Sequence, residues 1–190
     1  KSSEIIAAAH ERVGVPEWRT RPGGYDGLAR IIAYQQLSTK AAATIWGRVE
    51  VQLGKVTPAS VLEADIDALR ACGLSRQKAR YARALVAADL PYPDLRTAPT
   101  EEVIATLVAV PGIGRWTAEI YAMFSLGRAD VICPGDLALQ ESARMLFGLE
   151  ARPTERAFRA MAEPWSPWRG VAARLLWAYY RVAKEREGIR

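Results

Sequence analysis

The stretch AVPGIGRWTAE, residues 109–119, places two glycines one residue apart between segments of helix-forming sequence. Pro111 ends the first segment, because proline has no N–H to donate within a helix. Gly112 and Gly114 allow a tight turn that is free of side chains, and a second helix begins directly afterwards. The pattern predicts a helix-hairpin-helix over residues 107–118.

This turn exposes main-chain N–H groups at the start of the second helix, where the helix dipole adds partial positive charge. Such a socket suits phosphate, and it would hold a nucleic-acid backbone without reading the bases. Gly112 and Gly114 are therefore predicted to bind DNA. On this motif alone, an ordinary glycine turn between two helices remains the alternative.

The composition narrows the classes of protein that the chain can belong to. Its 190 residues suffice for a cooperative core, and no apolar run approaches the roughly 20 residues of a membrane helix. A net charge of +5 and a pI near 9.4 favour an acidic partner. We expect a soluble cytoplasmic protein that makes no use of a membrane.

Few residues are available for metal or thiol chemistry. Cys72 and Cys133 are too few for a disulfide framework or for a four-cysteine iron–sulfur cluster. His10 is the only histidine, which excludes a histidine cluster and a Ser-His-Asp relay built elsewhere in the chain. Most familiar hydrolytic machinery is thereby ruled out.

Helical patterns follow one another along the chain, and strand-like alternation is nearly absent. About ten helices with short connections predict an all-α, bundle-like domain. The proline-rich segment LPYPDLRTAP, residues 90–99, is the best candidate hinge, and a plain loop is its favoured interpretation. Polar residues in the N-cap position mark several of the helix starts: Ser38, Thr57, Asp65, Ser75, Asp136 and Thr154.

A second loop follows one helix after the hairpin. In ADVICPGDLALQ, residues 129–140, Pro134 and Gly135 interrupt the chain and Asp136 begins the next helix. A hairpin followed by a Gly/Pro-rich loop and an aspartate resembles the HhH-GPD superfamily of DNA glycosylases.

The resemblance extends to further segments in the same order. GIGRWTAEIYAM, residues 112–123, closely resembles the 3-methyladenine DNA glycosylase II branch. Three other segments are similar to recurring parts of that branch: IIAYQQLSTKAAATI (31–45), GLSRQKARYARAL (73–85) and EPWSPWRGVAARLLW (163–177).

This resemblance covers roughly residues 25–180 and implies a single HhH-GPD domain over residues 1–190. We expect two helical lobes, one of residues 32–128 and one of residues 1–31 with 129–190. The β-rich N-terminal subdomain of longer bacterial relatives is not expected, because the chain is too short to contain it. Monomer is the expected state.

Asp136 suits the chemistry that the resemblance implies. Cleaving the bond between a base and deoxyribose develops positive charge on the sugar, so the site needs a fixed anion. A helix N-terminus favours the charged form of a carboxylate. By resemblance, Asp136 is the catalytic residue, and an N-cap without catalytic role is the alternative.

The position two residues after the second hairpin glycine decides the reaction subtype. Relatives resembling endonuclease III carry there a lysine that attacks the sugar, whereas this chain has Trp116. We therefore expect a monofunctional enzyme that uses water and leaves an abasic site. An indole face attracts cationic purines such as 3-methyladenine and 7-methylguanine by about 0.5 to 2 kcal/mol. The resemblance adds Trp177 to this base pocket, and Ile120 stands where larger bacterial relatives have a pocket aromatic.

Base excision also requires that the nucleotide be flipped out of the duplex and that the gap be filled. By resemblance, Gln36 is the wedge that enters the stack, and a helix-terminal glutamine that faces solvent is the alternative. Thr117 and Lys78, near the starts of their helices, are also predicted to contact DNA. Arg76, Arg80 and Arg83 recur at helical spacing around Lys78. They are interpreted either as phosphate contacts or as a solvated basic face.

Similar enzymes hold a monovalent cation in the hairpin through main-chain carbonyls, here those of Val108, Val110 and Ile113. The resemblance thus allows a structural Na⁺ or K⁺, with no required cofactor and no iron–sulfur cluster. The expected partner is double-stranded DNA that contains alkylated bases.

Two other classes remain open at this point. One is a non-catalytic helix-hairpin-helix module that binds DNA. The other is a glycosylase for oxidised, deaminated or mismatched bases, which would read a neutral base by hydrogen bonds.

Overall fold

The computed structural model describes residues 2–17 and 19–186, and every regular element in this part of the chain is a helix. The predicted all-α class is confirmed. The chain forms two compact units, unit 1 of residues 1–20 with 127–190 and unit 2 of residues 21–126. Residues 21–31, which were expected with the chain ends, belong to unit 2 because their helix packs there.

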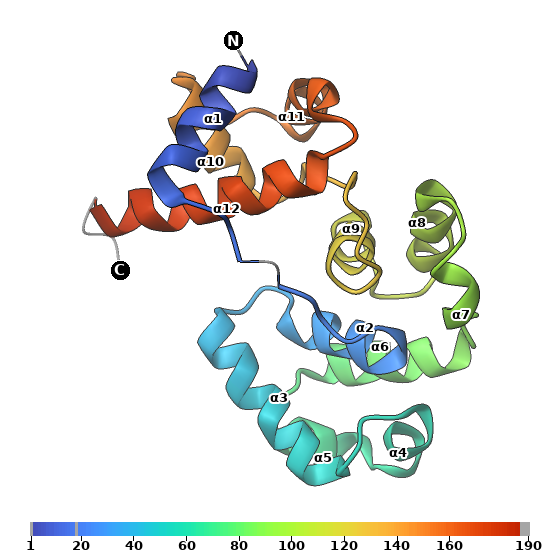
Figure 1. Cartoon of the computed structure of the whole chain (residues 1–190). Helices are drawn as coiled ribbons and strands as arrows, with labels where there is room; N and C mark the ends of the chain where they lie inside the picture. Colours follow the sequence, from blue (N-terminus) through green and yellow to red (C-terminus); the bar gives the residue numbers. More distant parts are fainter. Residues whose placement is uncertain (1, 18, 187–190) are drawn as a thin grey trace. The chain divides into compact units, whose positions relative to one another are not determined.

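Unit 2 is built around α2 (Gly24–Tyr34), whose apolar residues recur on one helical face. Leu28, Ile31 and Ile32 of this face are almost completely buried. Helix α2 packs against three partners, and α6 lies beside it in Figure 1. The other helices of the unit are α3 (Thr39–Leu53), α4 (Pro58–Glu63), α5 (Ile66–Ala71), α6 (Arg76–Ala87), α7 (Tyr92–Leu95), α8 (Thr100–Val108) and α9 (Arg115–Phe124).

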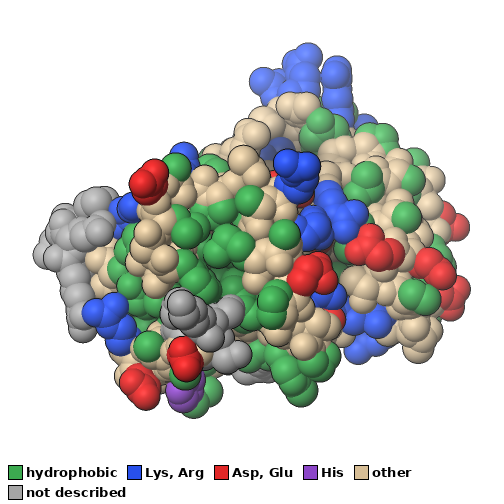
Figure 2. Space-filling view, turned by 90° about the horizontal axis from the view of Figure 1, so that it is seen from above, with side chains coloured by type: hydrophobic (Ala, Val, Ile, Leu, Met, Phe, Trp, Pro, Cys, Tyr) green, Lys and Arg blue, Asp and Glu red, His purple; other side chains and the backbone are tan. Residues whose placement is uncertain are grey.

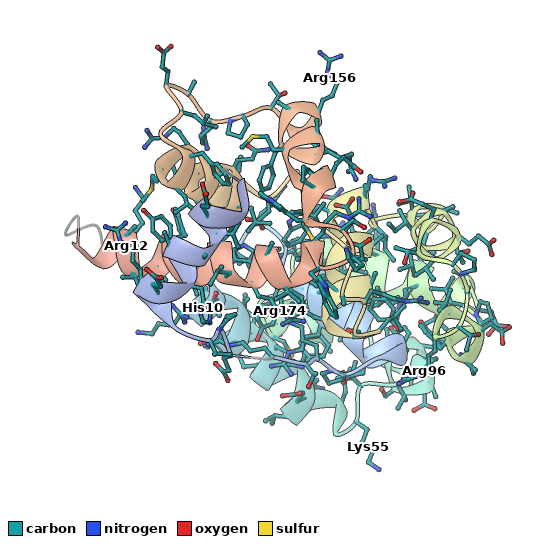
Figure 3. The ribbon with its side chains drawn as sticks, turned by 45° about the horizontal axis from the view of Figure 1, so that its top comes forward. His10, Arg12, Lys55, Arg96, Arg156 and Arg174 are labelled. Carbon is teal, nitrogen blue, oxygen red and sulfur yellow. The ribbon has the colours of Figure 1, made fainter. Side chains whose placement is uncertain are left out.

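Unit 1 is built around α12 (Arg169–Arg186), and both α1 (Ser2–Val13) and α10 (Leu137–Phe147) pack along it (Figure 1). Ala9, Leu175 and Tyr179 form the buried centre of this packing. Arg12 of α1 donates a hydrogen bond to the Tyr179 hydroxyl at 3.2 Å, and Figure 3 shows its place beside α12. Along the chain, α10 is followed by α11 (Glu155–Ala162) and the short 3₁₀ helix η1 (Glu163–Trp165), and α12 comes after them.

The predicted helix starts agree with the structure, and only the capping hydrogen bond at Asp65 is absent. The side chains of Ser38, Thr57, Ser75 and Thr154 each accept a hydrogen bond from an amide of the helix that follows. Asp65 occupies the N-cap position of α5, but its side chain makes no capping bond. The position was therefore predicted correctly, and the bond was not.

The proline-rich segment is not a plain loop, because residues 92–95 form α7. Pro93 lies in the first turn of this helix, where its missing N–H costs nothing. The prediction of a loop over residues 90–99 was wrong at these four positions.

Candidate nucleic-acid interface and active site

The hairpin joins α8 to α9 through residues 109–114. The turn is tight, because the Val110 amide donates to the Leu107 carbonyl at 3.0 Å and the Ile113 amide donates to the Val110 carbonyl at 3.1 Å. The predicted helix-hairpin-helix is thus present in unit 2.

The two hairpin glycines are there for different reasons. Gly112 has a φ of +91°, and a Cβ on it would lie 2.3 Å from the Tyr81 ring. Gly114 has an ordinary φ of −85°, and a Cβ on it would meet nothing within 4 Å. The fold therefore requires glycine at 112 but not at 114, where the space is open to a molecule outside the chain.

The start of α9 has no side-chain cap. Gly114 occupies the N-cap position, and the first turn carries no acidic residue. The first N–H groups of a helix lack intrahelical partners and carry partial positive charge. Gly114 is exposed, so this helix start can accept an anion from solution.

A cleft of about 500 Å³ lies beside the hairpin. Residues 108–114 form one wall, and the end of α2 with the start of α6 forms the other. The cleft brings together the predicted DNA contacts Gly112, Gly114, Gln36 and Lys78, as well as the candidate cation ligands Val108, Val110 and Ile113.

Gln36 lies in the turn after α2 with a φ of +56°, and its side chain is exposed. The next residue, Leu37, is 40% exposed. Leu37 was not predicted from the sequence, although an apolar residue in a polar turn was the available signal.

Lys78 does not extend freely into solution. Its Nζ donates to the carbonyls of Ala33 at 2.9 Å and Gln35 at 2.7 Å, and so binds the C-terminal end of α2. Burial lowers the pKa of the Lys78 ammonium. Because an ammonium has three donors, one remains beyond these two bonds.

The Thr117 hydroxyl is also turned inward. Thr117 is 2% exposed, and its Oγ1 accepts a hydrogen bond from Gln35 Nε2 at 2.8 Å. A phosphate contact at this position would have to use the main-chain N–H.

The basic residues of α6 divide into two kinds. Arg83 donates to the Ala64 carbonyl at 2.6 Å, so its guanidinium binds the main chain within unit 2. Arg76 and Arg80 are exposed. Of the three arginines, only these two have the accessibility that a phosphate contact needs.

Asp136 begins α10 in unit 1, and three donors converge on one of its oxygens. Its Oδ1 accepts from the amides of Ala138 and Leu139, both at 3.0 Å, and from Trp177 Nε1 at 3.1 Å. The predicted N-cap is therefore real, and the indole is an additional partner. Both side chains are half-buried. The bonds fix the orientation of the carboxylate.

Buried polar side chains hold the loop before Asp136. The Asp136 amide donates to the Cys133 carbonyl at 3.0 Å, and Gln140 Nε2 donates to the Pro134 carbonyl at 2.8 Å. Ser142 Oγ donates to the Leu176 carbonyl at 2.7 Å, which ties α10 to α12 next to Trp177. Gln140 and Ser142 were not predicted from the sequence, although their polarity on an otherwise apolar helix face was the available signal.

An ion pair fixes the start of α12, the helix that carries Trp177. Arg169 binds both oxygens of Asp130 at 2.8 Å, and Ser166 Oγ donates to Asp130 Oδ2 at 2.8 Å. Hydrogen bonding by Arg169 holds the pKa of the Asp130 carboxyl below its usual value. This pair was also missed, because its members lie 39 residues apart.

The remaining pocket candidates lie on α9 of unit 2. Trp116 is half-buried, and Ile120, one helical turn further on, is 4% exposed. The structure thus assigns Trp116 and Ile120 to the unit of the hairpin, and Asp136 and Trp177 to the other unit.

Other kinds of site find little support in the described part of the chain. No three His, Cys, Asp or Glu side chains there are grouped so that they could hold a metal ion. Cys72 and Cys133 are buried thiols without a disulfide, and His10 lies on the surface (Figure 2). None of the described helices has the length and apolarity needed to cross a membrane.

An open helix start in a glycine hairpin, together with an aspartate that caps a helix after a Gly/Pro-rich loop, defines the class of helix-hairpin-helix base-excision proteins. The model of the HhH-GPD superfamily of base excision DNA repair proteins matches residues 29–167. The chain belongs to this superfamily, as the resemblance in its sequence predicted.

The chain is also similar to individual members. It is 33% identical to DNA-3-methyladenine glycosylase 1 of Schizosaccharomyces pombe over 87% of this chain and 76% of that protein. It is 30% identical to DNA-3-methyladenine glycosylase 2 of Escherichia coli over 92% of this chain and 65% of that protein.

Two solved structures have the same fold. A DNA-3-methyladenine glycosidase from Bacillus halodurans gives a TM-score of 0.83 at 34% identity, over 95% of this chain and 86% of that one. The S. pombe 3-methyladenine DNA glycosylase Mag1 in complex with abasic DNA gives a TM-score of 0.82 at 30% identity, over 93% of this chain and 90% of that one. The resemblance to the 3-methyladenine branch is therefore confirmed.

Proposed function

We propose that the chain is a monofunctional DNA glycosylase that removes alkylated purines, such as 3-methyladenine and 7-methylguanine, and leaves an abasic site. One observation carries the proposal: the Asp136 carboxylate is held at the start of α10 by two helix amides and the Trp177 indole. The names of the relatives support the substrate class.

The proposed reaction begins with cleavage of the bond between the base nitrogen and C1′ of the sugar. Both electrons of the bond leave with the purine, and the sugar becomes positively charged. The Asp136 carboxylate stabilises this charge. Water then forms a bond to C1′, and its proton passes to Asp136 or to solvent.

The alkylated base needs no general acid, because it is cationic before cleavage and neutral after it. This fits a chain whose only histidine, His10, lies exposed on α1. At the position where a lyase would carry its amine, the chain has Trp116, so no Schiff base forms there and the strand stays intact.

Two tryptophans are proposed to select the base. The Trp177 ring is fixed by its bond to Asp136, and Trp116 has part of its surface exposed. Indole faces attract a cationic purine more strongly than a neutral one. Ile120 is proposed to shape the pocket from its largely buried position.

The hairpin is proposed to bind the DNA backbone. The open start of α9 at Gly114 accepts a phosphate, and Gln36 enters the base stack with Leu37 beside it. The third N–H of Lys78 and the main-chain N–H of Thr117 are further donors. One protein molecule is proposed to act on each site.

A monovalent cation is proposed to bind in the same cleft. Val108, Val110 and Ile113 all line it, and main-chain carbonyl oxygens are ligands that Na⁺ and K⁺ accept. Such an ion would offset the charge of a nearby phosphate. No other cofactor is proposed.

The experiment that tests this function uses duplex DNA methylated with dimethyl sulfate. Wild type and Asp136→Asn are incubated with it, free bases are quantified by liquid chromatography, and strand breaks are counted before and after alkali. We expect wild type alone to release 3-methyladenine and 7-methylguanine, with breaks appearing only after alkali.

Each other outcome identifies a rival class. Breaks without alkali would show lyase activity. Release only from oxidised or deaminated duplexes would show a different substrate class. No release from any duplex, with DNA binding intact, would leave a non-catalytic binding module.

A further inference from the structure

Gln35 directly precedes the predicted wedge Gln36, and its side chain is hydrogen-bonded to the hairpin. It is the C-cap residue of α2, and Gln36 follows it directly in the left-handed conformation. Its side-chain Nε2 donates to the Gly112 carbonyl at 3.1 Å and to Thr117 Oγ1 at 2.8 Å. An amide NH₂ has two donors, so both are used by the hairpin.

The main chain of Gln35 is held as well. Its carbonyl accepts from Lys78 Nζ at 2.7 Å, and its amide donates to the Ile32 carbonyl at 3.3 Å. The side chain and the backbone of this half-buried residue are therefore fixed by different elements of unit 2.

The two acceptors of the Gln35 side chain cannot shift easily. Gly112 is fixed in a positive-φ conformation against the Tyr81 ring, and Thr117 is buried in the first turn of α9. A movement of the α2 end would break both bonds to the hairpin. The position of the Gln36 turn is thus tied to the turn that offers amides to phosphate.

We propose that Gln35 is a positioning residue that couples the wedge at Gln36 to the glycine hairpin. The inference rests on the proposed function, because a wedge and a phosphate-binding hairpin have to engage the same DNA. Insertion beside a flipped nucleotide demands that both contact the duplex in one fixed register. Binding to intact duplex, which uses backbone contacts alone, does not demand it.

The test measures wedge insertion separately from base release. A duplex carries a tetrahydrofuran abasic analogue with 2-aminopurine as its neighbour, and insertion unstacks the 2-aminopurine and raises its fluorescence. Gln35→Met keeps the length of the side chain and removes its donors. Gln52→Met is the matched control, since Gln52 is an exposed glutamine on α3 outside the cleft.

We expect Gln35→Met to reduce the fluorescence rise at saturation about fivefold, while Kd for an intact duplex changes less than twofold. In a Gln36→Ala background, Gln35→Met should add less than a further twofold change. Gln52→Met should match wild type. Thr117→Val should resemble Gln35→Met, and Thr117→Ser, which keeps the hydroxyl, should restore the wild-type signal.

A purely structural role would give a different pattern. The coupling would be overturned if Gln35→Met reduced the fluorescence rise equally in the wild-type and Gln36→Ala backgrounds. It would also be overturned if either Gln35→Met or Gln36→Ala left the fluorescence rise unchanged. Base release by wild type from methylated DNA is measured in parallel. Its absence would overturn the proposed function, whatever the fluorescence shows.

Discussion

The helices α9 and α10 begin after similar loops, but only α10 has a side chain that caps its first amides. Each helix begins after a Pro-Gly turn, at Pro111-Gly112 and at Pro134-Gly135. Helix α10 is capped within the chain by the Asp136 carboxylate, whereas α9 has only Gly114 at its N-cap. One helix start already carries its anion, and the other is left open.

The difference shows how one physical property can serve two tasks. The amides at a helix start stabilise a negative charge. At α9 this charge is proposed to come from the DNA backbone, so the helix binds. At α10 the charge belongs to Asp136, and this anion is proposed to stabilise a cationic sugar. Exchanging the two arrangements should therefore separate binding from catalysis.

The largest effect is expected for Asp136→Asn. Asparagine also caps a helix, so stability should change by less than about 1 kcal/mol. The single-turnover rate of base release should fall at least about 100-fold, because the charge that stabilises the sugar is lost. Kd for intact duplex should not rise. A rate within threefold of wild type would mean that Asp136 is only a cap.

Gly112→Ala should come next, as an effect on stability. The positive φ and the contact with Tyr81 predict a loss of about 1–3 kcal/mol in the free energy of unfolding. Gly114→Ala is the matched control and should stay within about 0.5 kcal/mol. Urea denaturation measures both, and equal losses would contradict the different roles assigned to the two glycines.

Gly114→Asp gives α9 a carboxylate at the position where α10 has one. The added anion should compete with phosphate and raise Kd for duplex DNA about tenfold relative to Gly114→Asn, which caps without charge. The slope of log K against log salt should become shallower by about one. Identical affinities of the Asp and Asn variants would show that no phosphate binds at this helix start.

Trp177→Phe keeps an aromatic ring and removes the N–H that bonds to Asp136. The two helix amides remain, so we expect a smaller fall, about fivefold, in the single-turnover rate. Trp165→Phe is the control, because Trp165 is another tryptophan of unit 1 and packs against the rings of Phe147 and Phe158. A rate that falls equally in both variants would point to general loosening of unit 1.

The smallest expected effect is on stability and concerns the ion pair of Asp130 and Arg169 at the start of α12. Because Arg169 lowers the pKa of Asp130 in the folded state, the ion pair stabilises the fold fully above the pKa of the unfolded carboxyl, about 4. It is lost as pH falls through the lower folded pKa. The urea midpoint of wild type should therefore fall more between pH 5 and pH 3 than that of Asp130→Asn. Parallel curves would contradict this.

Local signals predicted much of the fold. Helices α3 and α10 begin directly after the predicted caps Ser38 and Asp136, and a glycine, Gly54 or Gly148, ends each of them. The hairpin and the place of Asp136 followed from the same kind of local pattern.

What the sequence could not supply were contacts between distant residues. Gly112 needs Tyr81 to explain it, and Lys78 is directed to Ala33, 45 residues away. No local pattern encodes that the Thr117 hydroxyl is used by Gln35. The helices and turns that carry the proposed DNA contacts were therefore predictable, but the hydrogen-bond partners of these side chains were not.

The central claim is that the Asp136 charge stabilises a cationic sugar. Its most direct test compares the affinity of wild type for two duplexes, one with a cationic pyrrolidine in place of the sugar and one with neutral tetrahydrofuran. A transition-state-like ligand should bind more tightly to the site that stabilises it. We expect wild type to prefer pyrrolidine at least about tenfold and Asp136→Asn to lose this preference. Equal affinity of wild type for both duplexes, or a preference that persists in Asp136→Asn, would contradict the account.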